Sequence, residues 1–414
     1  MKGTIRVASD KSISHRALII SSVAHGVSRI KNLLKSDDCM STMKCMENLG
    51  VEIYEKEGEV FVTGRGLRLT APSSALDAGN SGTTVRLLSG ILAGQNFTSD
   101  IFGDESLSRR PMRRVVDPLA KMGAVIETND GHLPMKITGG KLRPINYFSK
   151  ISSAQVKSCV LLAGLYASGS TNYTETEKSR DHTERMLGNF GARVAENGTT
   201  ISVAGEVSLH SSDIFVPGDI SSAAFFIVAA LLCGGSELKI ENVGINPTRI
   251  GILNVIGRMG GNLSVENKRV VCGEPLADIV VRSSELVSTA ITPKEIPLLI
   301  DEIPILAVAA TQARGTTVIS GAGELRVKET DRLKAVAAEL GKMGADISET
   351  EDGLTVKGPT RLKGAPVDSR GDHRMAMSLA VASLVADGVT EIKDRDCVKI
   401  SFPDFWELFS ELTK

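Results

Sequence analysis

Two cations, Lys11 and Arg16, lie in a short polar segment that opens an apolar run. Residues 10–16 read Asp-Lys-Ser-Ile-Ser-His-Arg, and the apolar residues 17–24 and Gly26 follow. This order predicts a helix with a polar cap and a glycine stop. A helix start presents free backbone N–H groups and a partial positive charge, which together bind anions. The added ammonium, guanidinium and hydroxyl groups predict an anion site, with a solvated helix end as the plainer alternative.

The same arrangement recurs along the whole chain. A polar opening, an apolar helix and a small-residue stop begin again near residues 80, 152, 219, 301 and 372. A second pattern, a helix end at a glycine followed by a strand, recurs at 49–53, 122–126, 190–194, 259–263 and 343–347. The spacing of about 70 residues predicts roughly six internal repeats.

Each repeat is predicted to be a small α/β unit. In the first, we expect a strand at 2–7, the helix after Asp10, a strand at 27–32 and a helix from Asp37 and Asp38 to Gly50. Strands at 51–54 and 59–63 would then form a hairpin that turns at Glu57 and Gly58. Such a unit exposes apolar faces and must stack against its neighbours to bury them.

The chain has a natural midpoint near residues 214–218, after three repeats. We therefore expect an α/β fold of two similar lobes, each of about three repeats, with a cleft between the lobes lined by helix starts. The N-terminal lobe would span residues 10–217. The C-terminal lobe would combine 1–9 with 218–414, since the first strand is expected to cross over.

Composition excludes several function classes. The net charge of the 414 residues is −1, and aromatic residues make up 4%, which argues against nucleic-acid binding. The six cysteines form no Cys-x-x-Cys pair and are expected to be reduced core thiols of a cytoplasmic protein. The longest apolar run, 223–233, is far shorter than the roughly 20 residues that span a bilayer. The six histidines show no metal-ligand spacing. We therefore expect no metal site, and the short apolar runs lead us to expect no membrane binding.

Further anion-binding candidates stand at the helix starts of the first half. Gly82 would let a ligand approach the backbone, with Arg86 one turn later. Arg109 and Arg110 precede a proline, as either a mobile clamp or solvated charge. The segment 153–157 offers the hydroxyl, amide and ammonium donors of Ser153, Gln155 and Lys157, and the segment 179–182 opens another helix.

Acidic candidates appear in the second half. Asp301 and Glu302 precede an apolar helix, as caps or, in a dry cleft, as a base of raised pKa. Lys328 and Arg332 are expected four residues apart on one helix face. Asp372 caps the last apolar helix. So many cations imply substrates with several negative charges, and the chemistry that fits is positioning, electrostatics and proton transfer.

Five segments together resemble one enzyme family. Residues 10–16, 79–83, 153–158, 326–333 and 372–376 closely resemble 5-enolpyruvylshikimate-3-phosphate synthase, nearly end to end, and 179–182 follows its second class. The resemblance implies transfer of a carboxyvinyl group from phosphoenolpyruvate to the 5-hydroxyl of shikimate 3-phosphate, with release of phosphate, in the shikimate pathway to aromatic amino acids. It implies no cofactor and a two-lobed fold of six α/β units, an inside-out α/β barrel.

The resemblance also implies roles for individual residues. The groups that would hold shikimate 3-phosphate are Lys11, Ser12, Arg16, Ser153, Ala154 through its backbone, Gln155, Arg180, Asp301 and Lys328. Those that would bind phosphoenolpyruvate are Lys11, Gly82, Arg110, Gln155, Arg332 and Arg374. The implied catalytic groups are Asp301, as acceptor of the 5-hydroxyl proton, with Lys11, Lys328, Glu329 and the supporting His373. Addition would form a tetrahedral ketal phosphate, and elimination would follow.

Two alternatives remain open. The related enzyme that acts on UDP-N-acetylglucosamine uses Lys-Asn in place of Lys11-Ser12 and a cysteine in a mobile loop, and residues 103–111 contain no cysteine. A non-catalytic repeat protein could bind phosphorylated ligands at the same helix starts. We expect a monomer, because no repeat needs a partner chain to bury its faces, and closure of the lobes on the first substrate.

Gly82 generates a first prediction. Glyphosate-tolerant members of the family carry alanine at this position, so the resemblance implies a glyphosate target. We expect micromolar glyphosate, or less, to inhibit turnover in an assay with both substrates. Turnover that millimolar glyphosate leaves unchanged would contradict this expectation.

Overall fold

Six apolar segments form helices that are buried nearly all round. These inner helices are α1 (Lys11–Ser22), α3 (Gly82–Ala93), α6 (Ala154–Gly164), α8 (Ile220–Leu232), α11 (Ile303–Thr311) and α13 (His373–Ser383). Every residue of α11 is buried, and in α8 only Leu232 is not. A helix that is apolar on all faces belongs inside a core. The polar residues at its start are therefore carried by a rigid element.

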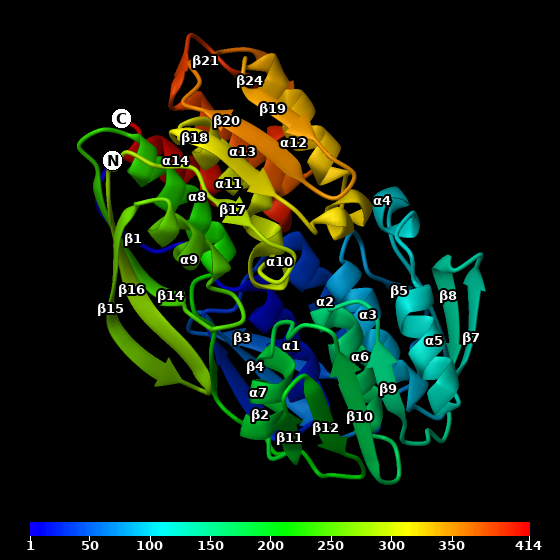
Figure 1. Ribbon diagram of the computed structural model, residues 1–414. Coiled ribbons are helices and arrows are strands. Elements are labelled where there is room, and N and C mark those ends of the chain that lie inside the picture. The colour runs from blue at the N-terminus through cyan, green and yellow to red at the C-terminus, as the bar shows by residue number, and fades with distance from the viewer. The chain divides into compact units, whose positions relative to one another are not determined.

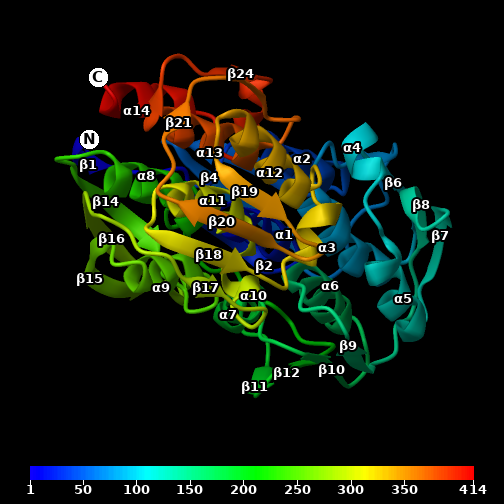
Figure 2. The same ribbon diagram turned by 45° about the horizontal axis from the view of Figure 1, so that its top comes forward.

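The computed structural model describes residues 1–414, and in it the chain divides into two units (Figures 1 and 2). Unit 1 comprises residues 1–8, 217–270 and 275–414, and unit 2 comprises residues 9–216 and 271–274. Each unit holds three inner helices and its own hydrophobic core. None of the helices combines the length and the apolar run needed to cross a membrane.

Unit 2 contains three four-stranded sheets with one shared strand order. In each sheet, a short edge strand pairs in parallel with its neighbour in the sheet. The other two pairs are antiparallel, and the last two strands form a hairpin. The first sheet is β13 (Ile214–Phe215), β2 (His25–Lys31), β4 (Glu59–Arg65) and β3 (Glu52–Lys56). The second is β5 (Leu76–Asp77), β6 (Thr98–Phe102), β8 (His132–Thr138) and β7 (Val125–Asn129). The third is β9 (Asn146–Ser149), β10 (Ser170–Glu175), β12 (Thr200–Ala204) and β11 (Val194–Asn197). The other helices are α2 (Asp37–Asn48), α4 (Glu105–Ser108), α5 (Arg113–Met122) and α7 (His182–Asn189).

Unit 1 keeps this order in two sheets and departs from it in the third repeat. The first sheet is β1 (Lys2–Ile5), β14 (Glu237–Gly244), β16 (Glu274–Arg282) and β15 (Asn262–Val271). The second is β17 (Ala290–Ile291), β18 (Gly315–Ile319), β20 (Leu354–Gly358) and β19 (Asp346–Glu349). The third repeat has two parallel pairs, β21 (Leu362–Lys363) with β23 (Ala386–Asp387) and β22 (Pro366–Asp368) with β24 (Glu391–Lys393). The other helices are α9 (Gly251–Arg258), α10 (Ile296–Leu299), α12 (Arg332–Lys342) and α14 (Phe405–Leu412), with the 3-10 turns η1 (Ile300–Glu302), η2 (Gly323–Val327) and η3 (Arg395–Ile400).

Two local predictions have different outcomes. The hairpin is confirmed, since Lys56 pairs with Glu59 and the turn residues Glu57 and Gly58 have φ of 55° and 77°. The prediction that Gly26 ends the first helix is wrong. Helix α1 ends at Ser22, and Gly26 lies within β2 opposite Gly64. A glycine is still required there, because φ is +100° and a Cβ atom would come 2.6 Å from Ser211 Oγ.

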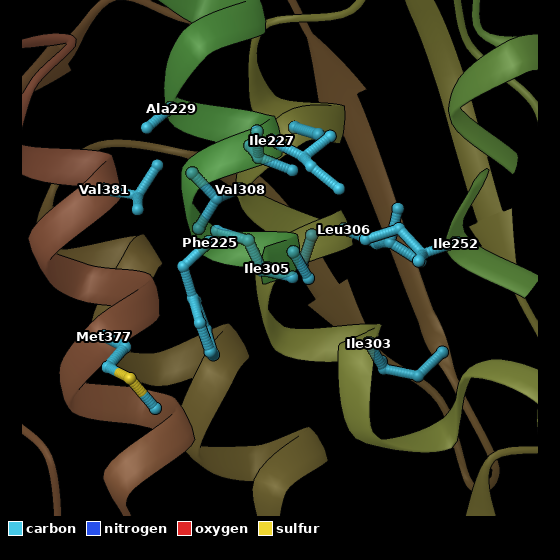
Figure 3. Close-up of a cluster of buried hydrophobic side chains, with 14 of the residues drawn as sticks. Phe225, Ile227, Ala229, Ile252, Ile303, Ile305, Leu306, Val308, Met377 and Val381 are labelled. Carbon is cyan, nitrogen blue, oxygen red and sulfur yellow. The ribbon is translucent and has the colours of Figure 1, made fainter. Parts of the chain in front are cut away.

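The core of unit 1 forms where the inner helices meet (Figure 3). Side chains of three inner helices gather there, among them Phe225 and Ile227 of α8, Ile305 and Val308 of α11 and Met377 of α13. An aromatic cluster extends this core, because Phe405 of α14 contacts Phe225 and Phe226 with ring centroids 6.3 and 5.7 Å apart. The C-terminal helix therefore packs against the inner helix α8 and covers part of the core of unit 1.

A glycine in each of four repeats lies against the end of an inner helix. A Cβ atom on any of them would come between 1.8 and 2.6 Å from a carbonyl oxygen there, and the four are Gly64, Gly139, Gly205 and Gly358. This close approach joins the sheet to the C-terminal end of the helix. The N-terminal end, which carries the unusual polar residues, takes no part in it.

We predict that Gly64→Ala destabilises the protein. Its Cβ would lie 2.3 Å from Ala24 O and 2.4 Å from Ser21 O, and overpacking of this kind costs about 1–3 kcal/mol or more. Urea denaturation followed by circular dichroism measures the change. Gly188→Ala is the matched control, because a Cβ atom added to that exposed helical glycine would have nothing within 4 Å. A midpoint for Gly64→Ala equal to that of the control would contradict the prediction.

Candidate active site

Lys11 lies in the first turn of α1 and is paired with a carboxylate. Asp10 caps the helix as predicted, because its Oδ1 accepts a hydrogen bond from Ile13 N–H at 2.8 Å. Lys11 Nζ lies 2.9 Å from Asp38 Oδ2, in the first turn of α2. Ser12 follows and is partly exposed. Asp38, expected only to open its helix, therefore also holds the ammonium of Lys11.

Arg16 is buried and joins three helices. Its Nε donates to Thr183 Oγ1 at 2.7 Å, its Nη2 to Ser158 Oγ at 2.7 Å and its Nη1 to Ser12 O at 2.9 Å. Burial lowers the pKa of Arg16 to about 10, so the side chain remains a cation at neutral pH. Its fixed guanidinium can bind an anion through its planar fork.

A buried chain of hydrogen bonds ties α1 and the middle of α2 to the start of α3. His15 Nδ1 and Thr42 Oγ1 are 2.7 Å apart, and Thr42 and Thr84 hydroxyls are 2.6 Å apart. Thr84 in turn donates to Ser81 Oγ at 2.7 Å. Burial lowers the pKa of His15 well below its ordinary value, as do Lys11 and Arg16, so the imidazole is neutral at neutral pH. Sequence reasoning missed this chain, which fixes the positions of Lys11 and Gly82.

Gly82 is the first residue of α3 and lies beside two guanidinium groups. A Cβ atom on Gly82 would be 3.1 Å from Arg86 Nη1 and 3.4 Å from Arg110 Nη1. Arg110 is buried and donates through Nη2 to Asn80 Oδ1 at 2.8 Å, whereas Arg109 is exposed and pairs with Glu105. Of the two candidates for a clamp, the structure therefore brings Arg110 to the start of α3 and leaves Arg109 in solvent.

Gln155 bridges α6 to α3. Arg86 Nη1 donates to Gln155 Oε1, and Gln155 Nε2 donates to Thr83 Oγ1 at 2.9 Å. Both ends of the amide are thus engaged, which sets its orientation. The sequence-predicted Gly82, Arg110 and Gln155 are brought into one region, and Arg86 joins them as a residue that holds Gln155.

The remaining candidates of unit 2 lie at the starts of α6 and α7. Ser153 and Ala154 are partly exposed at the start of α6, and Arg180 is partly exposed two residues before α7. Lys157, expected to offer its ammonium to a ligand, does not. Its side chain is 0% exposed and is paired with Glu175 and Glu184 at 2.8 and 2.7 Å.

In unit 1, three carboxylates surround one buried guanidinium. Arg332 Nε donates to Asp372 Oδ2 at 2.7 Å, Nη2 to Glu329 Oε2 at 2.7 Å and Nη1 to Asp301 Oδ1 at 3.3 Å. Burial opposes the charged guanidinium, but Asp372, Glu329 and Asp301 raise the pKa of Arg332 above its ordinary value. A substrate anion that binds Arg332 would therefore compete with these carboxylates for its N–H groups.

Arg374 brings a second guanidinium to Asp301. Its Nη2 lies 3.5 Å from Asp301 Oδ2, and its Nη1 donates to Asp301 O at 3.4 Å. Asp372 caps α13, as predicted, by accepting from Arg374 N–H at 2.9 Å, and His373 is buried beside it. Asp301 is not the cap of α11, since the cap position belongs to Glu302. Its carboxylate faces the two guanidinium groups instead.

Glu302 holds the turn that carries Asp301. Ser221 Oγ donates to Glu302 Oε1, and Arg249 Nη2 donates to both Ser221 Oγ and Asp219 Oδ1 at 2.8 Å. All four side chains are buried. Sequence reasoning missed this network beyond the Asp301-Glu302 pair, because Arg249 lies in a loop without a recognisable motif.

One local prediction about Lys328 is wrong. The 3-10 turn η2 ends at Val327, Lys328 is extended with φ −86° and ψ −157°, and α12 begins only at Arg332. Lys328 and Arg332 therefore do not share a helix face. The helix starts late because Asp331 caps it, accepting from Lys334 N–H at 3.1 Å.

Lys399, near the C-terminus, is exposed in η3.

The two clusters suit different chemistry. In unit 2, hydrogen-bond donors and cations gather at helix starts, which suits binding of phosphate and carboxylate groups. In unit 1, carboxylates lie against guanidinium groups, which suits proton transfer beside a bound anion. No group of three or more His, Cys, Asp or Glu side chains is placed to hold a metal ion.

We predict that Gly82→Ala weakens binding of phosphoenolpyruvate, the ligand that the resemblance implies for Gly82 and Arg110. The new methyl group would press on both guanidinium groups, so KM for phosphoenolpyruvate should rise about tenfold while KM for shikimate 3-phosphate changes little. Steady-state kinetics with each substrate varied in turn measure both constants. Gly188→Ala should leave both unchanged, and an unaltered KM for phosphoenolpyruvate in Gly82→Ala would contradict the prediction.

Comparisons with known proteins agree on one family. The family model of EPSP synthase (3-phosphoshikimate 1-carboxyvinyltransferase) matches residues 1–409. A 3-phosphoshikimate 1-carboxyvinyltransferase of Thermoanaerobacter sp. (strain X514) is 52% identical over 413 residues, covering 100% of this chain and 98% of that protein. One of Brevibacillus brevis is 50% identical over 417 residues, with coverage of 100% and 98%.

The fold leads to the same family. A solved structure of EPSP synthase from Acinetobacter baumannii superimposes with a TM-score of 0.89 at 45% sequence identity, covering 99% of this chain and 95% of that one. The two-lobed α/β architecture expected from the repeats is therefore confirmed. The family model matches nearly the whole chain, the relatives are about 50% identical in sequence, and the fold is the same. This chain therefore belongs to the EPSP synthase (3-phosphoshikimate 1-carboxyvinyltransferase) family.

Proposed function

We propose that this chain transfers the enolpyruvyl group of phosphoenolpyruvate to the 5-hydroxyl of shikimate 3-phosphate and releases inorganic phosphate. Membership of the family and the names of its relatives support this reaction. The observation that carries the mechanism is the Arg332 cluster, in which Asp301 and Glu329 both contact one buried guanidinium. It supplies an anion-binding group and two proton-transfer groups at one place.

In the proposed binding step, each unit contributes a separate set of ligands. Shikimate 3-phosphate is held by groups of unit 2, Lys11, Ser12, Arg16, Ser153, Ala154, Gln155 and Arg180, with Asp301 and Lys328 of unit 1. Phosphoenolpyruvate is held by Lys11, Gly82, Arg110 and Gln155 of unit 2 and by Arg332 and Arg374 of unit 1. The support is chemical, since guanidinium and ammonium groups at helix starts match phosphate and carboxylate groups.

The proposed reaction has two steps. In the addition, Asp301 accepts the proton of the 5-hydroxyl, and the oxygen of that hydroxyl attacks the enol carbon of phosphoenolpyruvate. Lys328 or Glu329 donates a proton to the methylene carbon. The product is a tetrahedral ketal phosphate. In the elimination, a proton leaves the new methyl group for the same residues and phosphate departs. His373, buried next to Arg374, supports these transfers, and Lys11 stabilises charge on the transferred group.

The direct test is phosphate release. Shikimate 3-phosphate and phosphoenolpyruvate should yield one phosphate and one enolpyruvyl product per turnover, with a metal chelator present. Replacing shikimate 3-phosphate with UDP-N-acetylglucosamine should yield none. Binding of both substrates without phosphate release would instead point to a non-catalytic binding protein and would overturn the proposal.

We also propose that the protein acts as a cytoplasmic monomer. Each unit closes its own hydrophobic core within the chain, and all six cysteines are free thiols. Light scattering after gel filtration should therefore give the mass of one chain. A mass of two chains or more would contradict the monomer.

We predict that Asp301→Asn and Glu329→Gln each lower kcat, by about 10²–10⁴-fold, because each removes a proton-transfer group without changing its shape. Glu329→Gln should keep or lower KM for phosphoenolpyruvate, because the neutral amide competes less for Arg332. Steady-state kinetics measure both constants.

Asp331→Asn is the matched control for these variants. Asp331 lies in the same segment but caps α12 and contacts Arg326, and asparagine is an equally good cap. Its kcat should stay within about twofold of the original enzyme, in line with a surface substitution. Equal losses in all three variants would show that disturbance of the segment, rather than proton transfer, lowers the rate.

A further inference from the structure

Lys157 is a buried lysine that no role in binding or proton transfer accounts for. It lies in α6 two residues after Gln155, and its side chain is 0% exposed. Its Nζ lies 2.8 Å from Glu175 Oε1, at the end of β10, and 2.7 Å from Glu184 Oε1, in α7. It also donates to the backbone oxygen of Ser179 at 3.1 Å. Lys157 therefore connects three elements and the loop 176–181.

Glu175 also binds Ser179, through the amide and hydroxyl groups of that residue. Ser179 N–H donates to Glu175 Oε1 at 2.8 Å, and Ser179 Oγ donates to Glu175 Oε2 at 2.6 Å. The amide, hydroxyl and carbonyl groups of Ser179 are thus all held by the Lys157–Glu175 pair. The next residue in the chain is Arg180, which is partly exposed. The backbone that presents Arg180 is fixed from inside the core.

The charges of this group are costly to bury and point to a role other than stability. Burial raises the pKa of Glu184, and despite burial the pKa of Lys157 is raised by Glu184 and Glu175. Lys157 is therefore charged at neutral pH. Because apolar side chains of similar volume often stabilise a core at least as well as a buried ion pair, stability alone does not explain the lysine.

The group also adjoins the residues that hold Arg16. Ser158 and Thr183, next to Lys157 and Glu184 in sequence, are hydrogen-bonded to each other at 2.6 Å, and both accept from Arg16 at 2.7 Å. Arg16 is thus held by direct hydrogen bonds to α6 and α7, whereas Lys157 alone contacts the carbonyl group of Ser179.

We propose that Lys157 is a positioning residue for shikimate 3-phosphate: it fixes the Ser179 backbone so that Arg180 presents its guanidinium to the ligand. This inference rests on the proposed function. Lys157 touches no substrate itself. It acts through Arg180, so removing it should weaken binding of this one substrate and leave the transfer of the enolpyruvyl group unchanged.

The test separates positioning from stability with a charge-matched double variant. Lys157→Met alone leaves two buried carboxylates without their ammonium and should lower the melting temperature. Lys157→Met with Glu184→Gln removes one charge of each sign and should recover the melting temperature, while the carbonyl group of Ser179 still lacks its lysine donor. In the double variant, KM and Kd for shikimate 3-phosphate should remain raised about tenfold, the scale of a lost charged hydrogen bond. KM for phosphoenolpyruvate and kcat should stay within about twofold.

Coupling to Arg180 identifies the route of the effect. Arg180→Gln should weaken binding of shikimate 3-phosphate in the original chain but add little in the double variant, because both changes remove the same contact. Lys178→Met is the control, since it removes a partly exposed lysine from the same loop and should leave Kd unchanged within about twofold.

The outcomes are distinct. An original chain that does not bind shikimate 3-phosphate by calorimetry overturns the proposed function. An original chain that binds, with a double variant that binds equally well, overturns the inference. So do additive effects of Arg180→Gln in the double variant, or a Lys178→Met variant as weak as the double variant. Raised KM for shikimate 3-phosphate with normal stability and no further effect of Arg180→Gln supports it.

Discussion

Cations placed at or near the starts of helices are the constraint on which this structure depends. A helix start repels a cation by about 0.3–1 kcal/mol, and burial adds a desolvation cost. The two units meet this cost in different ways. In unit 2, Arg16 and Arg110 donate to neutral hydroxyl, amide and backbone oxygens, which suit a guanidinium that is to bind an anion. In unit 1, Arg332 is surrounded by carboxylates, which neutralise it and place acid–base groups beside it.

The rigidity of the inner helices makes these arrangements usable. Because α8 and α11 are buried on almost every face, their starts cannot shift without disturbing a packed core. Behind the charged groups, further buried contacts fix each start, as Glu302 does through Ser221 and as His15 does through Thr42. Such preorganisation is what electrostatic stabilisation of a transition state requires, since the dipoles need not move during the reaction.

Much of the fold could be predicted because its signals are local. The hairpin at Glu57 and Gly58 and the caps at Asp10 and Asp372 follow from short-range turn and capping chemistry, which acts within a few residues. Prediction failed where distant segments decide. Gly26 lies in a strand because β2 pairs there with β4, where Gly64 is its partner. The third repeat of unit 1 loses its four-stranded sheet, and the pattern of a helix end at a glycine followed by a strand, which occurs in the other five repeats, is absent from it.

The sequence by itself determined which residue types stand at the helix starts, how often the pattern repeats and which family the motifs resemble, because these properties depend on order along the chain. Only the tertiary structure decided how the charges are paired. Lys157 was expected to offer its ammonium to a ligand and is instead buried and paired with two glutamates. Asp301 was expected as either a cap or a base, and it faces Arg332 and Arg374 instead of capping α11. The partners of these groups lie many residues away along the chain. Which of them meet is set by the packing of helices and strands, and no local pattern records it.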